Sequence, residues 1–187
     1  FLRDKANIQS GQKILINGAS RAVGTASIQL SKYFGAEITG ICSERNIKLV
    51  ESLGANKVID YTKEDFTKNQ ETYDVILDTV GNLSLPRCKN SLTKNGKLIL
   101  INTGLLTNLL SIVRKSVICG VAGESKESLN FLRELIDAGD IEAVIDKIYP
   151  LERTVEAHRY VDKGRKKGNV VLSVKYKIDS RSPRKIY

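Results

Sequence analysis

Residues 11–34, GQKILINGASRAVGTASIQLSKYF, join a short apolar run to a helical pattern through a turn of small residues. Residues 13–17 have the composition of a buried strand, and residues 25–34 repeat apolar side chains at helical spacing before Gly35 ends the helix. The turn between them, residues 18–24, places backbone N–H groups and the positive end of a helix dipole at one point. The stretch therefore predicts a phosphate-binding turn.

The turn is an incomplete form of the dinucleotide-binding fingerprint G-x-G-x-x-G. Gly18 and Gly24 stand at its two ends, whereas Ala19 and Ala22 occupy intermediate places. The alternative is an ordinary tight turn whose small residues only permit close packing. The complete strand–turn–helix context favours nucleotide binding over this alternative.

Composition limits the class of protein. A length of 187 residues suits one domain, and 41% hydrophobic residues is ordinary for a soluble globular chain. No apolar run approaches the roughly 20 residues that a membrane span needs, and residues 1–10 lack the pattern of a signal peptide. The sequence predicts no metal site, because it has one histidine, His158, and its three cysteines have no C-x-x-C spacing. The cysteines are Cys42, Cys88 and Cys119. Their apolar surroundings favour a reducing, cytoplasmic location.

The net charge of +9 is concentrated toward the end of the chain, in residues 165–167 and in a polar tail over residues 175–187. Such charge can attract nucleic acid, acidic lipid or an anionic small molecule. No aromatic residues are interleaved with the basic ones, as they are in single-strand binders. We therefore interpret the basic clusters as solvated surface and predict no nucleic-acid partner.

Strand and helix patterns alternate along the chain after the opening stretch. Unbroken apolar strands separated by helices predict a mainly parallel, doubly wound α/β sheet of about six strands with helices on both faces. Asn95-Gly96 is a turn signal, residues 105–113 fit either a loop or a helix, and strands 144–149 and 169–174 are expected outside the sheet. The other predicted strands are 37–42, 57–60, 73–78, 97–101 and 115–121, and the other predicted helices are 44–53, 83–91, 125–138 and 154–163.

The end of the second strand normally carries an acidic residue that binds the adenosine ribose. Cys42 stands there instead, and an arginine fork at Arg45 matches the oxygens of a 2′-phosphate. This favours NADP(H) over NAD(H). The candidate 2′-phosphate residues are Ser43, Arg45, Asn46 and Lys48.

Two observations at the same place point elsewhere. Glu44 would favour an unphosphorylated ribose unless its side chain points to solvent. Ser43 could simply cap a helix whose charges are exposed.

The chain resembles the cofactor-binding half of a medium-chain dehydrogenase/reductase, of the zinc-independent quinone oxidoreductase-like branch. The resemblance covers nearly all of residues 8–174. It is carried by the opening stretch through CSERN, then by LVESLGANKVIDY, YDVILDTVGN and YPLERTVEAHRYVDKGRKKGNVVLSV. The combination is more specific than any one of these pieces.

The resemblance implies which residues bind the cofactor. The turn would cover the pyrophosphate, although Arg21 and Ala22 replace two glycines of the usual pattern. Tyr61 would lie near the adenosine, and the residues after the fourth and fifth strands would border the cofactor and its nicotinamide ribose. The implied cofactor residues are Gly18, Ala19, Ser20, Arg21, Ala22, Val23, Gly24, Ser43, Arg45, Asn46, Lys48, Tyr61, Thr79, Val80, Asn102, Thr103 and Gly104.

The resemblance also implies a function. The implied function is that of an NADP(H)-dependent oxidoreductase, which reduces a quinone or an activated carbonyl or alkene by direct hydride transfer. No residue of this sequence is assigned as catalytic. The family's β-rich catalytic domain is expected to be missing, so that this chain alone has little activity. Residues 1–174 would form the NADP-binding domain, with 141–174 returning toward the missing domain, and 115–121 would be a sheet edge that forms a homodimer.

Two other classes remain as alternatives. A non-catalytic NADP(H)-binding module or scaffold fits the missing domain and the altered turn. A methyltransferase would usually have an acidic residue ahead of a G-x-G turn at the first strand, whereas Ile16-Asn17 precedes Gly18 here. The second strand also lacks an acidic residue at its end.

Overall fold

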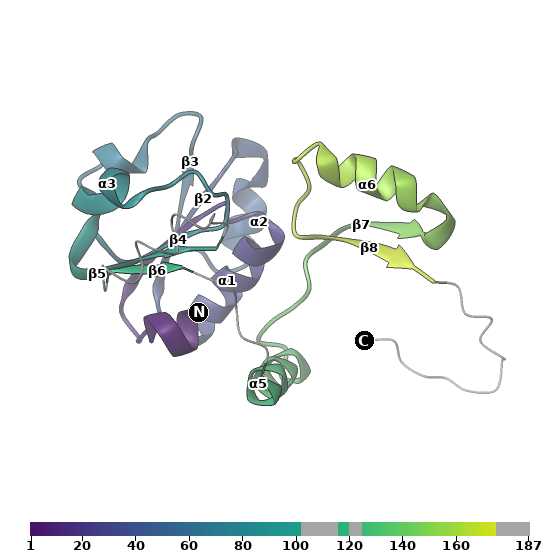
Figure 1. The fold of residues 1–187 in the computed structure, drawn as a ribbon, viewed down its shortest axis with the longest axis horizontal. Coiled ribbons are helices and arrows are strands. Elements are labelled where there is room, and N and C mark those ends of the chain that lie inside the picture. The colour runs from purple at the N-terminus through teal and green to yellow at the C-terminus, as the bar shows by residue number, and fades with distance from the viewer. Residues whose placement is uncertain (102–115, 120–124, 175–187) are drawn as a thin grey trace.

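The computed structural model describes residues 1–101, 116–119 and 125–174 (Figure 1). Six strands form one sheet in the order β3-β2-β1-β4-β5-β6, and every neighbouring pair is parallel. This confirms the predicted doubly wound parallel sheet. The strands are β1 (Lys13–Asn17), β2 (Glu37–Cys42), β3 (Lys57–Asp60), β4 (Tyr73–Asp78), β5 (Leu92–Leu100) and β6 (Val117–Cys119).

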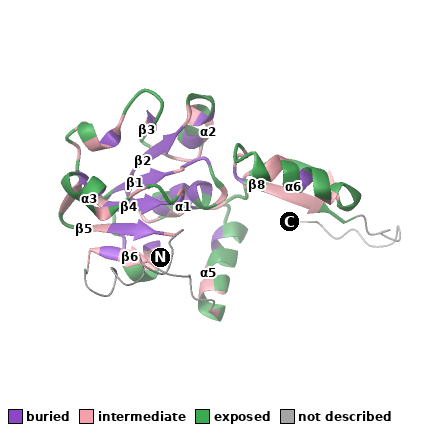
Figure 2. Ribbon diagram, turned by 45° about the horizontal axis from the view of Figure 1, so that its top comes forward, coloured by how far each residue is buried: buried purple, intermediate pink, exposed green. Residues whose placement is uncertain are grey.

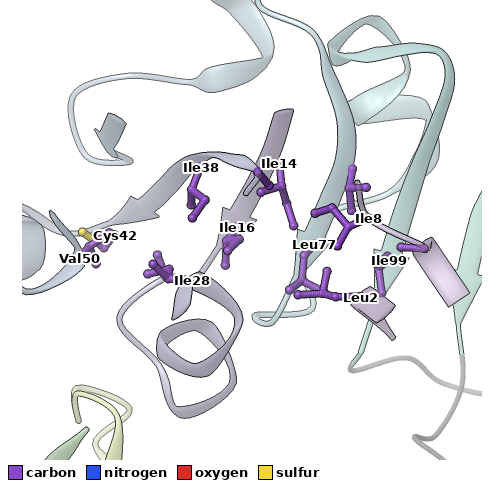
Figure 3. Packing of buried hydrophobic residues seen from close by; sticks show 14 residues of the cluster. Leu2, Ile8, Ile14, Ile16, Ile28, Ile38, Cys42, Val50, Leu77 and Ile99 are labelled. Carbon is purple, nitrogen blue, oxygen red and sulfur yellow. The ribbon is translucent and has the colours of Figure 1, made fainter. Parts of the chain in front are cut away.

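Two hydrophobic clusters lie on the two faces of the sheet. Successive side chains of a strand point to opposite faces, so one strand contributes to both clusters. Ile14 and Ile16 of β1 pack into one core cluster with Ile28 of α1, as Figure 3 shows, whereas Leu15 packs into the other cluster with Cys88 of α3. The helices are α1 (Ala22–Tyr33), α2 (Ile47–Ser52), α3 (Leu85–Cys88), α5 (Lys126–Asp137) and α6 (Thr154–Asp162).

The short helix Leu2–Ala6 is an element for which the sequence analysis predicted nothing. Leu2 and Ala6 are buried in the same cluster as α1, and the Lys97 ammonium donates a 2.7 Å hydrogen bond to the Ala6 carbonyl. A single turn is too short to display a hydrophobic period, so its sequence carries no signal.

Some element bounds differ from the predictions. The predicted helix 44–53 begins as a 3₁₀ turn, Glu44–Asn46, before α2. The turn predicted at Asn95-Gly96 is wrong, because both residues lie within β5 beside an irregularity in its register with β4. Gly96 is needed there, since a Cβ would lie 2.9 Å from the Tyr73 carbonyl oxygen. The predicted loop or helix 105–113 and the basic tail 175–187 lie outside the described residues. So do residues 115, 120 and 121 of the predicted strand 115–121.

A separate unit follows α5. Its strands β7 (Ile145–Pro150) and β8 (Asn169–Ser173) pair with each other in parallel, and α6 connects them along the chain. These strands lie outside the six-stranded sheet, as predicted. Figure 1 shows the β7–α6–β8 unit beside the main sheet, and Figure 2 shows that buried residues are concentrated in the sheet and are sparse in this unit. Contacts with other parts of the chain therefore matter for its placement.

Gln29 of α1 holds the segment that leads into this unit. Its amide nitrogen donates to the Glu142 carbonyl at 3.0 Å, and its amide oxygen accepts from the Glu142 N–H at 2.8 Å. The second tether is at the other end of the unit, where the Gly168 N–H donates to the Ser20 carbonyl at 2.8 Å.

Replacing Gln29 by alanine is expected to loosen the attachment of the β7–α6–β8 unit. The change leaves both backbone groups of Glu142 without their partner, which costs about 1–3 kcal/mol locally. Hydrogen exchange at Glu142 is expected to accelerate roughly tenfold or more. Gln12→Ala, before β1 and away from this unit, is the control, and equal exchange at Glu142 in both variants would contradict the tether.

Candidate functional site

A cleft of about 480 Å³ opens beside the carboxyl ends of β1, β2 and β4. The strand order reverses between β1 and β4, and ligands of open α/β sheets bind at such a switch point. Further walls come from the loop after β3, the loop after β4 and residues 164–166 of the β7–α6–β8 unit. Eight of the predicted cofactor residues line the cleft: Gly18, Ser20, Arg21, Ser43, Arg45, Asn46, Tyr61 and Val80.

The turn from β1 to α1 depends on close packing at its two glycines. Gly18 has a φ of +81°, and a Cβ there would lie 2.5 Å from Thr79 Oγ1. A Cβ at Gly24 would overlap the carbonyl oxygen of Gly18, so the first turn of the helix lies directly against the strand end. Arg21 has ordinary extended angles, φ −81° and ψ 169°, so the turn accepts it without a glycine.

The start of α1 is available to an anion. Arg21 occupies the N-cap position and its side chain makes no capping hydrogen bond, and the first turn contains no acidic residue. Helix geometry leaves the N–H groups of Ala22, Val23 and Gly24 without an intrahelical acceptor. These three residues and Ala19 are not among the residues that line the cleft. Their contribution to a ligand would come from the main chain.

A buried carboxylate organises the loop after β4. Asp78 has no exposed surface, and its oxygens accept hydrogen bonds from the N–H groups of Val80, Gly81 and Leu83 at 2.9–3.1 Å. It also accepts a 2.9 Å hydrogen bond from the amide of Asn17. The loop is therefore held against the end of β1.

Two asparagines reach the cleft from this network, and the sequence analysis assigned neither. The Asn17 amide donates to Asn82 Oδ1 at 2.7 Å, and both residues line the cleft. Thr79, which was a predicted cofactor residue, is buried and donates from its hydroxyl to the Asn17 carbonyl at 2.8 Å. It supports the loop and does not line the cleft. Only the position of Asn17 at the end of an apolar strand could have signalled its place.

The end of β2 presents Ser43 and Arg45 to the cleft. Glu44 does not line it, because its exposed carboxylate pairs with the Lys63 ammonium at 2.9 Å. Lys48 is exposed and also lies outside the lining. Burial, and next the Asp60 carboxylate, raises the pKa of Cys42 to about 11, so this thiol stays protonated at neutral pH.

Asn46 joins the two loops that meet at the cleft. The residue is 5% exposed, and its amide nitrogen donates to Ser20 Oγ at 2.9 Å and more weakly to Ser43 Oγ at 3.4 Å. Its buried Oδ1 has no donor among the described residues. Asn46 therefore ties the turn to the end of β2 and retains one acceptor for a ligand group or water.

Apolar side chains also line the cleft. They belong to exposed Tyr61, to Phe66 and to Leu83. Asp65 also lines the cleft and is 3.7 Å from the Arg87 guanidinium. The hydroxyl and amide of Thr67, followed by Arg87, hold the pKa of Asp65 below its ordinary value. This part of the lining suits a flat base with polar edges.

Residues 164–166 are the part of the cleft that the sequence analysis missed most clearly. We interpreted the basic run 165–167 as solvated surface, yet Arg165 and Lys166 line the cleft. The loop returns to the turn, since Gly168 pairs with Arg21 and accepts a 2.6 Å hydrogen bond from the Lys166 ammonium. Only the tertiary structure brings them together, because 140 positions separate Gly24 of the turn from Gly164 of the loop.

Three predicted residues, Asn102, Thr103 and Gly104, lie outside the described part of the chain. Within that part, no three His, Cys, Asp or Glu side chains gather where a metal ion could be held. His158 is exposed on α6 and does not line the cleft. No helix among the described residues is long and apolar enough to cross a membrane.

Comparisons with known proteins show the family and the fold of the chain. The model of a family described as "Zinc-binding dehydrogenase" matches residues 53–172. The chain is 32% identical to the mouse (Mus musculus) "NAD(P)H oxidoreductase RTN4IP1, mitochondrial", over 88% of this chain and 48% of that protein. It is also 32% identical to "Quinone-oxidoreductase QR1, chloroplastic" from Triphysaria versicolor, over 86% of this chain and 52% of that protein.

The chain thus spans about half the length of the curated relatives it matches. A solved structure with the same fold is the quinone oxidoreductase from Coxiella burnetii, with a TM-score of 0.83 and 24% sequence identity. That match covers 92% of this chain and 56% of the other.

Proposed function

We propose that this chain, which belongs to the zinc-binding dehydrogenase family, is the cofactor-binding portion of an NADP(H)-dependent oxidoreductase. Relatives named as NAD(P)H and quinone oxidoreductases support a nicotinamide cofactor and hydride transfer. The acceptor that we propose is a quinone or an activated carbonyl or alkene. Residues 1–174 form the cofactor-binding domain, and 141–174 face the domain that binds the acceptor.

The observation that carries the choice of NADP(H) is the environment of Arg45. Its guanidinium is exposed at the cleft, and no carboxylate of the described residues forms an ion pair with it. Glu44, the one acid at the end of β2, is turned away and paired with Lys63. A ribose diol would lack its usual acidic partner here, whereas a 2′-phosphate would gain a charged hydrogen-bonding fork.

The rest of the cleft fits the same cofactor. The uncapped start of α1 suits the diphosphate, Tyr61 and Phe66 suit the adenine, and the buried Oδ1 of Asn46 can accept from a ribose hydroxyl. The bound cofactor would supply the hydride. This chain's own residues bind and orient it, and none of the described ones is assigned a catalytic role.

We further propose that the reaction does not use a zinc ion held by this chain. Despite the family's description, the described residues do not assemble a zinc ligand set, since buried Cys42 and Cys88 pack in different core clusters. The second candidate function is a non-catalytic NADP(H)-binding module, which the replacement of two turn glycines by Arg21 and Ala22 favours.

Two expectations remain predictions. β6 is an edge of the sheet and is the strand through which we expect a homodimer. A cytoplasmic location is predicted from the cysteines, while the relatives compared above include a mitochondrial and a chloroplastic protein.

Replacing Arg45 by alanine is expected to weaken NADPH binding about 10- to 100-fold and to leave NADH binding unchanged. An arginine–phosphate hydrogen bond contributes about 1.5–3 kcal/mol, and only NADPH carries the 2′-phosphate. Isothermal titration calorimetry of both nucleotides measures the difference. Arg133→Ala on α5 is the matched control, because it removes an exposed arginine charge that does not line the cleft.

Equal loss of both nucleotides in Arg45→Ala would show that the 2′-phosphate is not bound there. Absence of binding to the unaltered chain would overturn the proposed function. The non-catalytic module would be favoured by a third result. In it, the chain binds the nucleotide but reduces no acceptor, even when the part of a relative that this chain does not match is added.

A further inference from the structure

We propose that Arg21 is a direct ligand of the cofactor diphosphate and supplies a charge that the usual glycine-rich turn lacks. This inference rests on the proposed function and assigns a role within that site. It also explains how a turn that has lost two glycines can still hold its ligand.

The main chain of Arg21 is fixed on both sides. Its N–H donates to the Gly18 carbonyl at 2.9 Å, its carbonyl accepts from the Thr25 N–H at 2.8 Å, and it pairs with Gly168 of the β7–α6–β8 unit. The side chain is therefore the free part of the residue. It lines the cleft, and its Cδ lies 3.4 Å from the point where a Cβ on Gly18 would stand. The side chain thus runs over Gly18, at the end of β1.

Arginine is a poor residue for this position in the absence of a ligand. Serine, threonine, aspartate and asparagine are preferred at the N-cap because they accept a hydrogen bond from the first turn, which arginine cannot do. Its charge also faces the positive end of the α1 dipole. Among the described residues no carboxylate pairs with it, and α1 has no acid in its first turn. A bound anion would satisfy the helix start and the guanidinium together.

A second observation indicates that a ligand fills this part of the cleft. Asn46 is buried and hydrogen-bonds Ser20, the residue before Arg21, yet its Oδ1 lacks a donor within the described part of the chain. A sugar hydroxyl beside the diphosphate would supply that donor. Lys166, which hydrogen-bonds the Gly168 carbonyl next to Arg21, adds a further cation for a doubly charged group.

Diphosphate is common to NADPH, NADH and ADP, whereas the 2′-phosphate is present only in NADPH. Loss of Arg21 should therefore weaken all three ligands by one factor. Loss of Arg45 should weaken NADPH alone. This difference separates the inference from the proposed function on which it rests.

The test is calorimetric titration of the 187-residue chain with NADPH, NADH, ADP and AMP. Arg21→Gln keeps the length of the side chain and removes its charge, and Arg21→Gly restores the usual turn residue. Arg133→Gln, on the exposed surface of α5, is the matched control for removing one arginine charge. Thermal melts of each variant verify that it is folded.

In Arg21→Gln we expect about tenfold weaker binding of NADPH, NADH and ADP, and a smaller loss for AMP, which has one phosphate. Unchanged ADP binding in this variant, with selective NADPH loss in Arg45→Ala, would overturn the role of Arg21 and leave the proposed function standing. Tighter binding by Arg21→Gly would overturn it as well, because the side chain would then be crowding the ligand. No binding by the unaltered chain would overturn both.

Discussion

Gly24→Ala is expected to destabilise the folded chain by about 3 kcal/mol and to abolish nucleotide binding. The new Cβ would overlap the Gly18 carbonyl oxygen and would lie 2.8 Å from Ala19 Cα, and both neighbours are backbone atoms that cannot rotate away. Alanine is a better helix former than glycine by about 1 kcal/mol, so helix propensity alone predicts the opposite sign. Urea unfolding measures which effect is larger.

The matched control for Gly24 is Gly139→Ala. Gly139 follows α5 with a φ of +78°, and a Cβ there would meet no atom within 4 Å. Its cost is only the left-handed backbone, about 1–2 kcal/mol, without an effect on the cleft. If Gly24→Ala were as stable as the unaltered chain, α1 would not lie against β1 as closely as the structure has it.

Asp78→Ala is expected to cost about 4 kcal/mol, since it removes the acceptor of three backbone N–H groups and of the Asn17 amide. The loop after β4 would lose the contacts that hold it, and Asn17 and Asn82 would lose their positions at the cleft. Nucleotide affinity should therefore fall together with stability. Chemical unfolding and calorimetric titration of the same sample measure both.

Asp74→Ala is the control on the same strand. Asp74 also accepts a backbone hydrogen bond, from Lys13, but it lies away from the cleft and is only partly buried. Its loss should lower stability by about 1 kcal/mol and leave binding unchanged. Asp78→Asn keeps the size of the side chain, and full stability in that variant would mean that the carboxylate charge is not required.

Local sequence pattern predicted the sheet well. The bounds of the second, third and fourth strands agree with the structure, because each is a short run with buried apolar residues at its centre or end, bounded by polar residues or glycine. The pattern failed where length or context removed the signal. The turn at Asn95-Gly96 is absorbed into β5, and the single turn Leu2–Ala6 had no period to detect.

The candidate site divides in the same way. Gly18, Ser43 and Arg45 reach the cleft because each follows a strand whose end the sequence marks. Arg165 and Lys166 could not be assigned, because their places depend on pairings between segments far apart in the chain. Asn17 was missed although it ends the first apolar strand, directly before Gly18. The direction of Glu44 was an open question for the same reason, and its pairing with Lys63 of the next loop decides it.

The sequence alone determined the strand–turn–helix unit and the parallel sheet, since periodicity and turn chemistry act over a few neighbouring residues. For the ligand of the turn it supplied a prediction, a phosphate group. Only the tertiary structure decided which charges face the cleft, because that depends on how loops from different strands meet. Burial of Asp78 and Asn46, and the return of residues 164–168 to the turn, arise from contacts across the whole chain.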